Sequence, residues 1–332
     1  NIVASRFGLL SNVERIERMD EVDLGKAQTD ELVGIVFDKR YQIIGILGSG
    51  ATSTVYKAED LLLQRQVALK IIHSHLLLTP RAVERFKSEA ATNTNLAHTN
   101  IARVYRQGVS GDGRLYLIMD CIDGETLADR LSRQGALKLA EFFEIFQQLI
   151  EALFYAHEQG IVHRDIKPSN IVLENSTENE KAILVDFGIA KFIGEDGDQG
   201  RTQTGGLLGS SAYMSPEQCR SSADIDGRSD IYSLGCVMLE SLAGESAFEG
   251  ESALDIMYKH LNQSLGKIGF LQELPAPLSN LLKKCLDKDR SNRYQNMQEL
   301  KREFNKCYET QDLLSESWRT KKSAPLSPTN KI

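Results

Sequence analysis

Two polar strings, separated by a short apolar run, constrain this chain more than any other feature. Residues 163–170 read HRDIKPSN, and residues 186–188 read DFG directly after the apolar residues AILV. In this order they would bring a proton acceptor, a lysine and two oxygen ligands for Mg²⁺ into one cleft. Phosphoryl transfer requires mainly positioning and charge neutralisation, and these residue types suit both tasks. A polar loop could contain the first string by chance, but it would not predict the second.

The bulk composition excludes several classes of protein. The 332 residues suggest two domains or one two-lobed fold. With 41% hydrophobic and 26% charged residues, the chain can bury a core and does not have the composition of a disordered protein. The net charge of −7, with no basic block to offset it, argues against nucleic acid as the main partner.

The cysteines and the hydropathy pattern indicate the compartment. Five cysteines are scattered without C-x-x-C spacing, which is typical of free thiols in a reducing environment. No stretch approaches the roughly 18 apolar residues of a membrane span, and no signal peptide is recognisable. We therefore expect a cytoplasmic catalytic domain without a membrane segment in this chain, although a parent protein could carry an anchor elsewhere.

The order of the periodic segments predicts an α+β fold. Strand patterns dominate up to residue 122, and helical patterns follow, which indicates two lobes. Strands are expected at 41–50, 53–60, 66–72, 114–122 and 182–185, and helices at 80–97, 139–159, 230–243, 252–262, 277–287 and 296–309. We expect an N-terminal extension over 1–37, a catalytic domain over 38–310 (lobes 38–122 and 123–310) and a disordered tail over 311–332.

Two features upstream of these strings fit a nucleotide site. The glycine-rich turn at 48–50 lies between two strands, where backbone N–H groups could approach a polyphosphate; a simple hairpin turn is the alternative. Lys70 lies in an apolar strand. It is either a strand-edge lysine that reaches water or a buried cation that needs an anion. Glu89 is the favoured partner on the following helix, and Glu84 is the alternative.

From Tyr41 to about Cys307 the chain resembles the protein kinase family, and most closely the bacterial eukaryotic-like (Hanks-type) Ser/Thr kinases. The resemblance rests on the glycine-rich loop, VALK, Glu89, HRDIKPSN, DFG, MSPE at 214–217, SDIYSLG at 229–235 and RSNRY at 290–294. It implies a small β-rich N-lobe with one regulatory helix, a larger helical C-lobe and a nucleotide cleft between them. One departure is Ser53, which stands at the third glycine of the loop pattern.

The resemblance implies a role for each polar residue. Asp165 would accept the proton of the substrate hydroxyl, and Lys167 would reach the γ-phosphate of ATP. Lys70, paired with Glu89, would hold the α- and β-phosphates. Mg²⁺, with Mn²⁺ as an alternative, would be bound by Asn170 and Asp186. Structural roles are implied for Glu217, which would pair with Arg293, and for Asp230, which would hold the backbone of the catalytic loop.

An adenine pocket can be assigned by the same comparison. Met119 would be the gatekeeper, Asp120, Cys121 and Ile122 the hinge, and Val55, Ala68 and Val172 the walls around the purine. The expected ATP-binding residues are Leu47, Gly48, Ser49, Gly50, Val55, Ala68, Lys70, Met119, Asp120, Cys121, Ile122 and Val172.

Substrate class and regulation follow from the resemblance as well. A lysine two places after the catalytic aspartate is similar to the Ser/Thr branch, so the expected partners are protein substrates and ATP. Thr202 and Thr204 resemble an autophosphorylation pair, and a homodimer could carry out that reaction in trans. Ser210 stands where the family has a threonine that contacts the catalytic loop. Ile256, Met257 and Tyr258 are candidates for a partner or dimer surface, with core packing as the favoured alternative.

Three functions remain open at this point. The leading one is an active Mg²⁺-ATP-dependent, non-specific Ser/Thr protein kinase. The second is a pseudokinase that binds ATP or serves only as a scaffold, favoured by Ser53 and by the polar Asn93 one turn after Glu89. The third is a kinase-fold enzyme that acts on a small molecule, against which the MSPE segment and the long activation loop argue.

Overall fold

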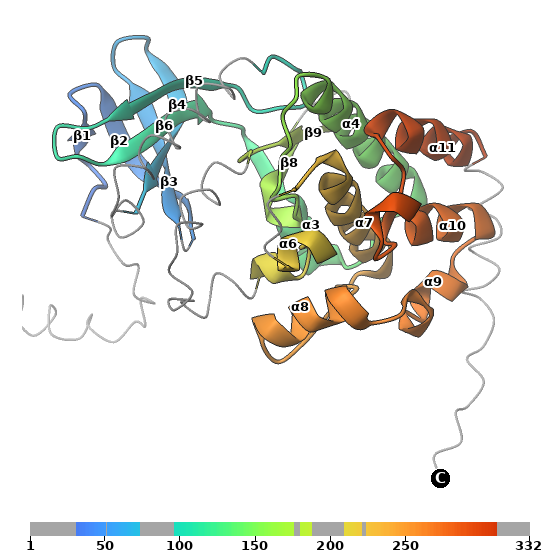
Figure 1. Cartoon of the computed structure of the whole chain (residues 1–332). Helices are drawn as coiled ribbons and strands as arrows, with labels where there is room; N and C mark the ends of the chain where they lie inside the picture. The colour runs from blue at the N-terminus through green and yellow to red at the C-terminus, as the bar shows by residue number, and fades with distance from the viewer. Residues whose placement is uncertain are drawn as a thin grey trace, which may run out of the picture.

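A six-stranded antiparallel sheet and a helical bundle occupy opposite ends of the molecule (Figure 1). The computed structural model describes residues 31–50, 52–73, 96–175, 180–187, 209–220 and 224–310. The sheet comes first in the chain and the helices follow, as the sequence pattern predicts. The fold is therefore α+β with two lobes.

The smaller lobe is the sheet, in the order β1-β2-β3-β4-β6-β5. Valine, isoleucine and tyrosine are frequent in its strands and favour extended backbone. The central strand β4 is buried on both faces, because Val67, Leu69 and Ile71 pack into one cluster while Ala68 and Ile72 pack into another. The strands are Val36–Phe37 (β1), Tyr41–Ser49 (β2), Ser53–Asp60 (β3), Arg65–Ile72 (β4), Val104–Val109 (β5) and Leu115–Asp120 (β6).

The sheet begins before residue 38, where we expected the catalytic domain to start. β1 pairs with β2 through Val36 opposite Gln42 and Phe37 opposite Tyr41, and Phe37 is buried against the ring of Tyr116. The sequence does not reveal this strand because Val36 is exposed, so no alternation of buried and exposed residues marks it. The expected helix at 80–97 lies outside the described residues, apart from its last two positions.

The larger lobe is built around α4 and α7, which pack against each other and against α10 and α11. α4 buries one wide apolar face that includes Phe142, Phe143 and Phe146, and it ends just before Gly160, whose positive φ no side chain opposes. The predicted helices from 139 onward are confirmed. The helices are Leu127–Gln134 (α3), Leu139–Glu158 (α4), Pro216–Cys219 (α6), Gly227–Ala243 (α7), Ala253–Asn262 (α8), Phe270–Glu273 (α9), Ala276–Cys285 (α10) and Met297–Glu309 (α11).

A small sheet lies where the two lobes meet. It consists of Gly124–Thr126 (β7), Ile171–Glu174 (β8) and Lys181–Leu184 (β9), in the order β7-β8-β9. The HRDIKPSN string joins α4 to β8, and the DFG string follows β9, so this sheet brings the two strings together. The backbone of Leu184 also bonds to that of Asn100 and Ala102, which ties the chain just before β5 to the larger lobe.

One arginine connects several elements beneath this sheet. Arg130 on α3 lies 2.5 Å from Glu125 of β7, 2.5 Å from Glu141 of α4 and 2.6 Å from Glu180. Its side chain is largely buried, where ion pairs are screened less than at the surface. The three carboxylates come from three segments, so α3, α4 and the β7-β9 sheet are held as one block. No helix within the described ranges is both long enough and apolar enough to cross a bilayer.

Candidate active site

The HRDIKPSN segment presents Asp165, Lys167 and Asn170 on one side of the loop between α4 and β8. Lys167 Nζ lies 2.9 Å from Asp165 Oδ2. Asn170 Nδ2 lies 2.8 Å from the backbone oxygen of Asp165 and 3.1 Å from its Oδ2. The short helical turn Pro168–Asn170 orients the asparagine back toward the aspartate. The loop therefore fixes a carboxylate between an ammonium and an amide.

The backbone of this loop is held by Asp230, at the start of α7. Asp230 accepts hydrogen bonds from the N–H groups of His163 and Arg164, each at 2.8 Å, and from His157 Nε2 at 2.8 Å. Arg164 has φ 64°, a left-handed conformation that costs free energy in a non-glycine residue. Burial acts to raise the pKa of Asp230, but these donors outweigh it and hold the pKa below its ordinary value. Asp230 therefore stays charged and stabilises the strained turn.

The DFG segment connects the two lobes through an ion pair. Lys70 Nζ, from β4, lies 2.8 Å from Asp186 Oδ1, and Asp186 also has positive φ, 60°. The ring of Phe187 packs 4.4 Å from that of His163, which links the DFG segment to the catalytic loop. Glu89, the expected partner of Lys70, lies outside the described residues. Among the described carboxylates Asp186 is the one that pairs with Lys70.

The residues fit a hard divalent cation. Both hydrogen bonds of Asn170 use Nδ2, which leaves its Oδ1 as an oxygen ligand, and Asp186 supplies a carboxylate from the DFG segment. Within the described ranges no three His, Cys, Asp or Glu side chains form a metal cluster. Two protein oxygens with remaining positions for water and phosphate oxygens are the usual arrangement for Mg²⁺ at a nucleotide. The donor set is therefore compatible with Mg²⁺ bound together with ATP.

Some of the residues expected around the purine lie together in the structure. Ala68 and Met119 belong to one cluster of buried residues, against which Val55 and Cys121 pack, and Leu47 is half exposed at 51%. The glycine-rich residues 48–50 lie at the end of β2, and Val172 lies on β8. Val55, Ala68, Met119 and Cys121 are thus neighbours in the structure, and the placement of Leu47 and Val172 around the same purine stays a prediction.

Two details define the limits of this pocket. A cavity of about 20 Å³ is lined by Met119, Lys70, Leu117 and Phe187, among others. The N–H of Asp120 bonds to the oxygen of Arg103, and its carboxylate accepts from the N–H of Arg103. A purine could therefore contact Asp120 only through the backbone carbonyl of Asp120. Ile122 lies two residues further along the hinge.

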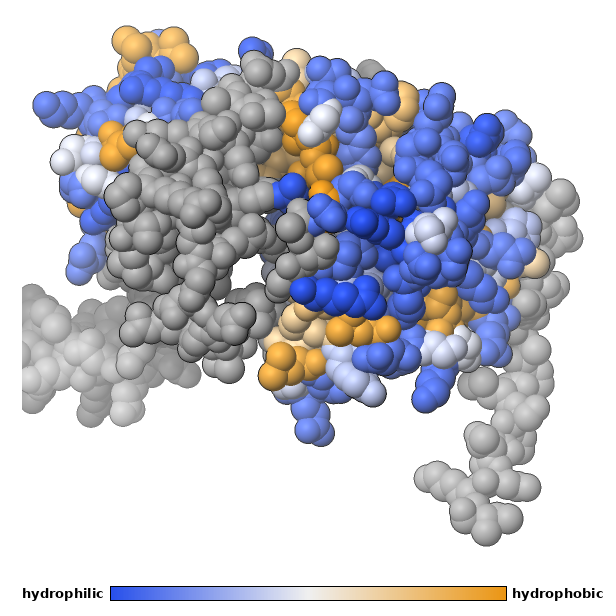
Figure 2. Space-filling view, viewed as in Figure 1, coloured by the Kyte–Doolittle hydropathy of each residue, from blue (hydrophilic) through white to orange (hydrophobic). Residues whose placement is uncertain are grey.

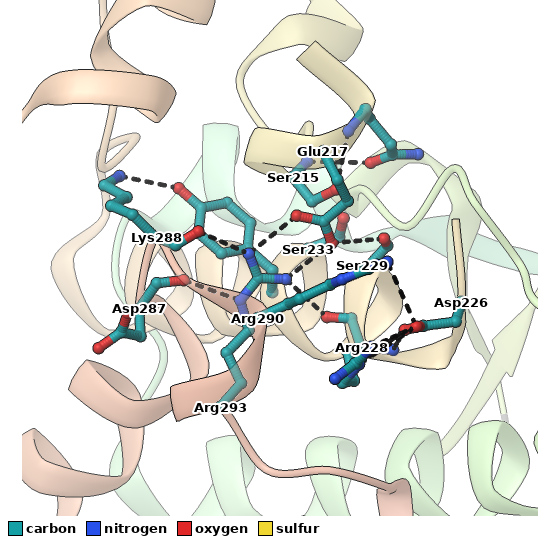
Figure 3. Close-up of polar contacts among 12 residues, drawn as sticks. Ser215, Glu217, Asp226, Arg228, Ser229, Ser233, Asp287, Lys288, Arg290 and Arg293 are labelled. Atoms are coloured by element: carbon teal, nitrogen blue, oxygen red, sulfur yellow. Dashed lines mark hydrogen bonds and ion pairs between the residues drawn. The ribbon is translucent and has the colours of Figure 1, made fainter. Parts of the chain in front are cut away.

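A buried ion pair supports the segment that follows the activation loop (Figure 3). Arg293 Nη1 lies 2.8 Å from Glu217 Oε1, and Nη2 lies 2.9 Å from Oε2, while Ser229 Oγ donates to Glu217 at 2.6 Å. The Arg293 side chain is fully buried. Burial acts to raise the pKa of Glu217, but the bonds from Arg293 and Ser229 outweigh it and lower the pKa. The pair that the resemblance implies is present as a bidentate contact.

Gln218 is a site residue that the sequence analysis missed. Its Nε2 donates to the backbone oxygen of Arg164 at 2.8 Å, while its Oε1 accepts from the N–H of Ser215 in a capping box at the start of α6. The pattern S-x-x-Q at 215–218 is the sequence signal for such a cap. On the same side, Ser210 Oγ lies 3.1 Å from Lys167 Nζ. Ser210 and Gln218 thus both contact the catalytic loop.

Some predicted features are not covered by the described residues. Thr202, Thr204 and Asn93 lie outside them, as does Glu89. Tyr258 on α8 is 64% exposed and Leu254 is 75% exposed, whereas Ile256 is buried. In Figure 2 apolar residues gather along the margin of the larger lobe where α8 lies. Core packing was therefore the wrong alternative for Tyr258 but the right one for Ile256.

Comparison with known proteins places this geometry in a family. The sequence model described as the protein kinase domain matches residues 41–305, and the chain belongs to the protein kinase family. It is 38% identical to the serine/threonine-protein kinase PknB of Mycobacterium tuberculosis over 79% of this chain. It is 34% identical to the serine/threonine-protein kinase PrkC of Bacillus subtilis over 85% of this chain.

Solved structures agree with the fold. The kinase domain of PknI from Mycobacterium tuberculosis superposes with a TM-score of 0.66 at 25% identity, covering 83% of this chain and 98% of that domain. The chain spans 42% of the length of both PknB and PrkC.

Proposed function

We propose that this chain is a Ser/Thr protein kinase domain of the non-specific type, which transfers the γ-phosphate of Mg-ATP to protein hydroxyl groups. The observation that carries the proposal is the joint placement of Asp165, Lys167 and Asn170 on one loop with the Lys70–Asp186 pair nearby. Asp165 Oδ2 lies 2.9 Å from Lys167 Nζ and 3.1 Å from Asn170 Nδ2. No residue needed for phosphoryl transfer is missing from the described loop.

Each residue performs a distinct part of the reaction. Asp165 binds the substrate hydroxyl, orients it and takes its proton as the oxygen attacks, because a carboxylate is the acceptor within reach. Lys167 and Lys70 offset the negative charge of the phosphates from the two lobes. Mg²⁺, or Mn²⁺ in its place, supplies charge neutralisation at the phosphate oxygens when bound by Asn170 and Asp186. The contact between Lys167 and Ser210 joins the lysine proposed to reach the γ-phosphate to the segment proposed to bind protein substrate.

Substrate choice and regulation are part of the same proposal. Lys167 lies beside Asp165 and favours a short Ser or Thr side chain, since both groups must reach the attacking oxygen. Arg164 adjoins the catalytic base, and a phosphate on Thr202 or Thr204 would supply an anion for it. We propose autophosphorylation there, in trans within a homodimer. All five cysteines are free thiols, which suits work in the cytoplasm.

Incubation with Mg²⁺ and γ-labelled ATP tests the proposal. The wild-type chain is compared with Asp165→Asn and with the matched control Asp255→Asn, which removes a partly exposed carboxylate on α8. The labelled residues are then mapped by mass spectrometry. Label on Thr202 or Thr204 in the wild type and the control, lost in Asp165→Asn, would support the kinase. ATP binding without label in any of the three would favour the scaffold alternative.

A further inference from the structure

A row of three polar side chains runs through the larger lobe, away from the catalytic residues. Lys288 Nζ lies 3.1 Å from the hydroxyl of Tyr232 on α7, and that hydroxyl lies 2.9 Å from Nδ1 of His260 on α8. Tyr232 and His260 are fully buried. The ring of Phe248 covers the row, 4.3 Å from the His260 ring and 4.4 Å from Lys288 Nζ.

The direction of the hydrogen bonds follows from the chemistry of the groups. A charged lysine can only donate, so the oxygen of Tyr232 accepts from Lys288. The phenol proton then points to its other partner, Nδ1 of His260. Burial and the charge of Lys288 lower the pKa of His260 to about 3, so the ring is neutral and carries one proton. Because Nδ1 accepts, that proton is on Nε2.

Nε2 of His260 is the end of the row opposite Lys288. It is buried and makes no hydrogen bond of good geometry within the described residues. The backbone of Ser211 and of Ala212 comes near enough to the imidazole to raise its pKa, and because Nδ1 is already bonded to Tyr232, Nε2 is the ring nitrogen left for these groups. A buried N–H without an acceptor is unfavourable, so it favours approach of these carbonyl groups. Ser210, next to them, lies against Lys167, and Ser233 Oγ donates to the carbonyl of Tyr213.

We propose that Lys288, Tyr232 and His260 are positioning residues, which set the tautomer of His260 so that its Nε2–H holds residues 211–212 in place for protein substrate. The proposal rests on the kinase function proposed above. Lys288 acts through Tyr232, and His260 acts on the backbone of the segment that lies beside the catalytic lysine. Without the charge of Lys288, the hydroxyl of Tyr232 no longer has to donate its proton to Nδ1 of His260. The other tautomer of His260 then becomes accessible, in which Nε2 is an acceptor and cannot bond to a carbonyl oxygen.

The structural arm of the test does not depend on activity. The full chain is prepared with ¹⁵N-labelled histidine, and the resonances of His260 are assigned against a His260→Gln spectrum. The wild type should show a protonated Nε2 and an accepting Nδ1. Lys288→Met and Tyr232→Phe should give a mixture of tautomers. Lys284→Met is the matched control, because Lys284 lies 4.4 Å from the Tyr294 ring, outside the row. A wild-type tautomer in both Lys288→Met and Tyr232→Phe overturns the proposal.

The kinetic arm separates positioning from general damage. With myelin basic protein as the probe substrate, Lys288→Met should raise the KM for protein roughly three- to ten-fold, the range for one lost hydrogen bond, with the KM for ATP unchanged. Its melting temperature should stay level or rise, because burial lowers the pKa of Lys288 to about 8 and the charged form is unfavourable there. An unchanged protein KM with an altered tautomer also overturns the proposal. Inactivity of the wild type with the expected tautomer would refute the kinase function and leave the row intact.

Discussion

Gln218 Nε2 lies 2.8 Å from the backbone oxygen of Arg164, so one side chain joins the first turn of α6 to the loop that carries Asp165. The N–H of Arg164 is held from the opposite side by Asp230. The peptide groups on either side of this left-handed residue are thus each fixed by a different element. The placement of the catalytic base therefore depends on α6 and α7, both far from it in the sequence.

Replacing Gln218 tests this coupling. Gln218→Glu keeps an oxygen to accept from Ser215 but loses the donor and places a carboxylate against a carbonyl. We expect kcat to fall about ten-fold, equivalent to roughly 1.4 kcal/mol, with the KM for ATP unchanged. Steady-state kinetics checks this beside Gln66→Glu, an exposed glutamine on β4. Equal kcat values in the two variants would contradict the role.

Replacing Asp230 tests the support of the catalytic loop. Asp230→Asn turns one accepting oxygen into an N–H₂ group that faces buried donors, which costs about 1–3 kcal/mol. We expect lower stability in urea and a lower kcat, because the backbone of His163 and Arg164 loses its anchor. Asp255→Asn on α8 is the control, because its ion pair with Lys259 is only partly buried and lies away from the catalytic loop. Wild-type stability and turnover in Asp230→Asn would refute the anchoring role.

The Glu217–Arg293 pair should dominate the stability of the larger lobe. Arg293→Met leaves a buried carboxylate without its partner, and loss of one member of a buried pair costs about 3–5 kcal/mol. The double variant Glu217→Gln/Arg293→Met should recover part of that loss, which a double-mutant cycle in urea would measure. Lys306→Met breaks the exposed pair with Glu303 and should change stability by less than about 0.5 kcal/mol. Strict additivity in the cycle would contradict the pairing.

The same carboxylates predict how stability depends on pH. Burial alone would raise the pKa values of Glu217 and Asp230, but their hydrogen bonds lower both below the ordinary values of 4.5 for glutamate and 3.8 for aspartate. A carboxyl group whose pKa is lower in the folded state stabilises the fold above its unfolded pKa, and this stabilisation is lost as pH falls. The contribution of these two carboxylates to the free energy of unfolding should therefore be level from pH 7 to about 5 and decrease below about pH 4.5. Buried His260, whose pKa is lowered to about 3 in the fold, makes the total free energy of unfolding fall already below about pH 6.5.

Urea denaturation between pH 7 and pH 3 checks that dependence. Glu217→Gln should show a shallower decrease at acid pH, since one of the two groups no longer titrates. Glu158→Gln, at the exposed end of α4, should keep the wild-type slope. A steeper acid slope in Glu217→Gln would contradict the assignment.

Sequence reasoning succeeded where the physical signal is local. The helix α4 has strong periodicity, the strands at 53–60 and 66–72 contain β-branched residues that favour extended backbone, and the HRDIKPSN and DFG strings carry their chemistry in adjacent residues. β5 was missed because none of its residues is buried, three being partly buried and three exposed, and α3 because it buries only Leu127 and Leu131 among charged residues. Contacts between distant segments, such as Gln218 with Arg164 or Lys288 with Tyr232, leave no spacing pattern. They depend on the three-dimensional fold.

The ion pairs of Arg130 with three carboxylates have a consequence for how the lobes can move. Arg130 holds β7 through Glu125, and the carbonyl of Asp123 accepts from the N–H of Asn175 at the end of β8. The chain is therefore anchored to the larger lobe from residue 123 onward. On the other crossing, Asn100 and Ala102 are bonded to Leu184. Rotation of the sheet against the helices is therefore confined to an axis through Cys121–Ile122 and the residues just after Ala102. The peptide groups expected to hold the purine lie on that axis, where a rotation displaces them least.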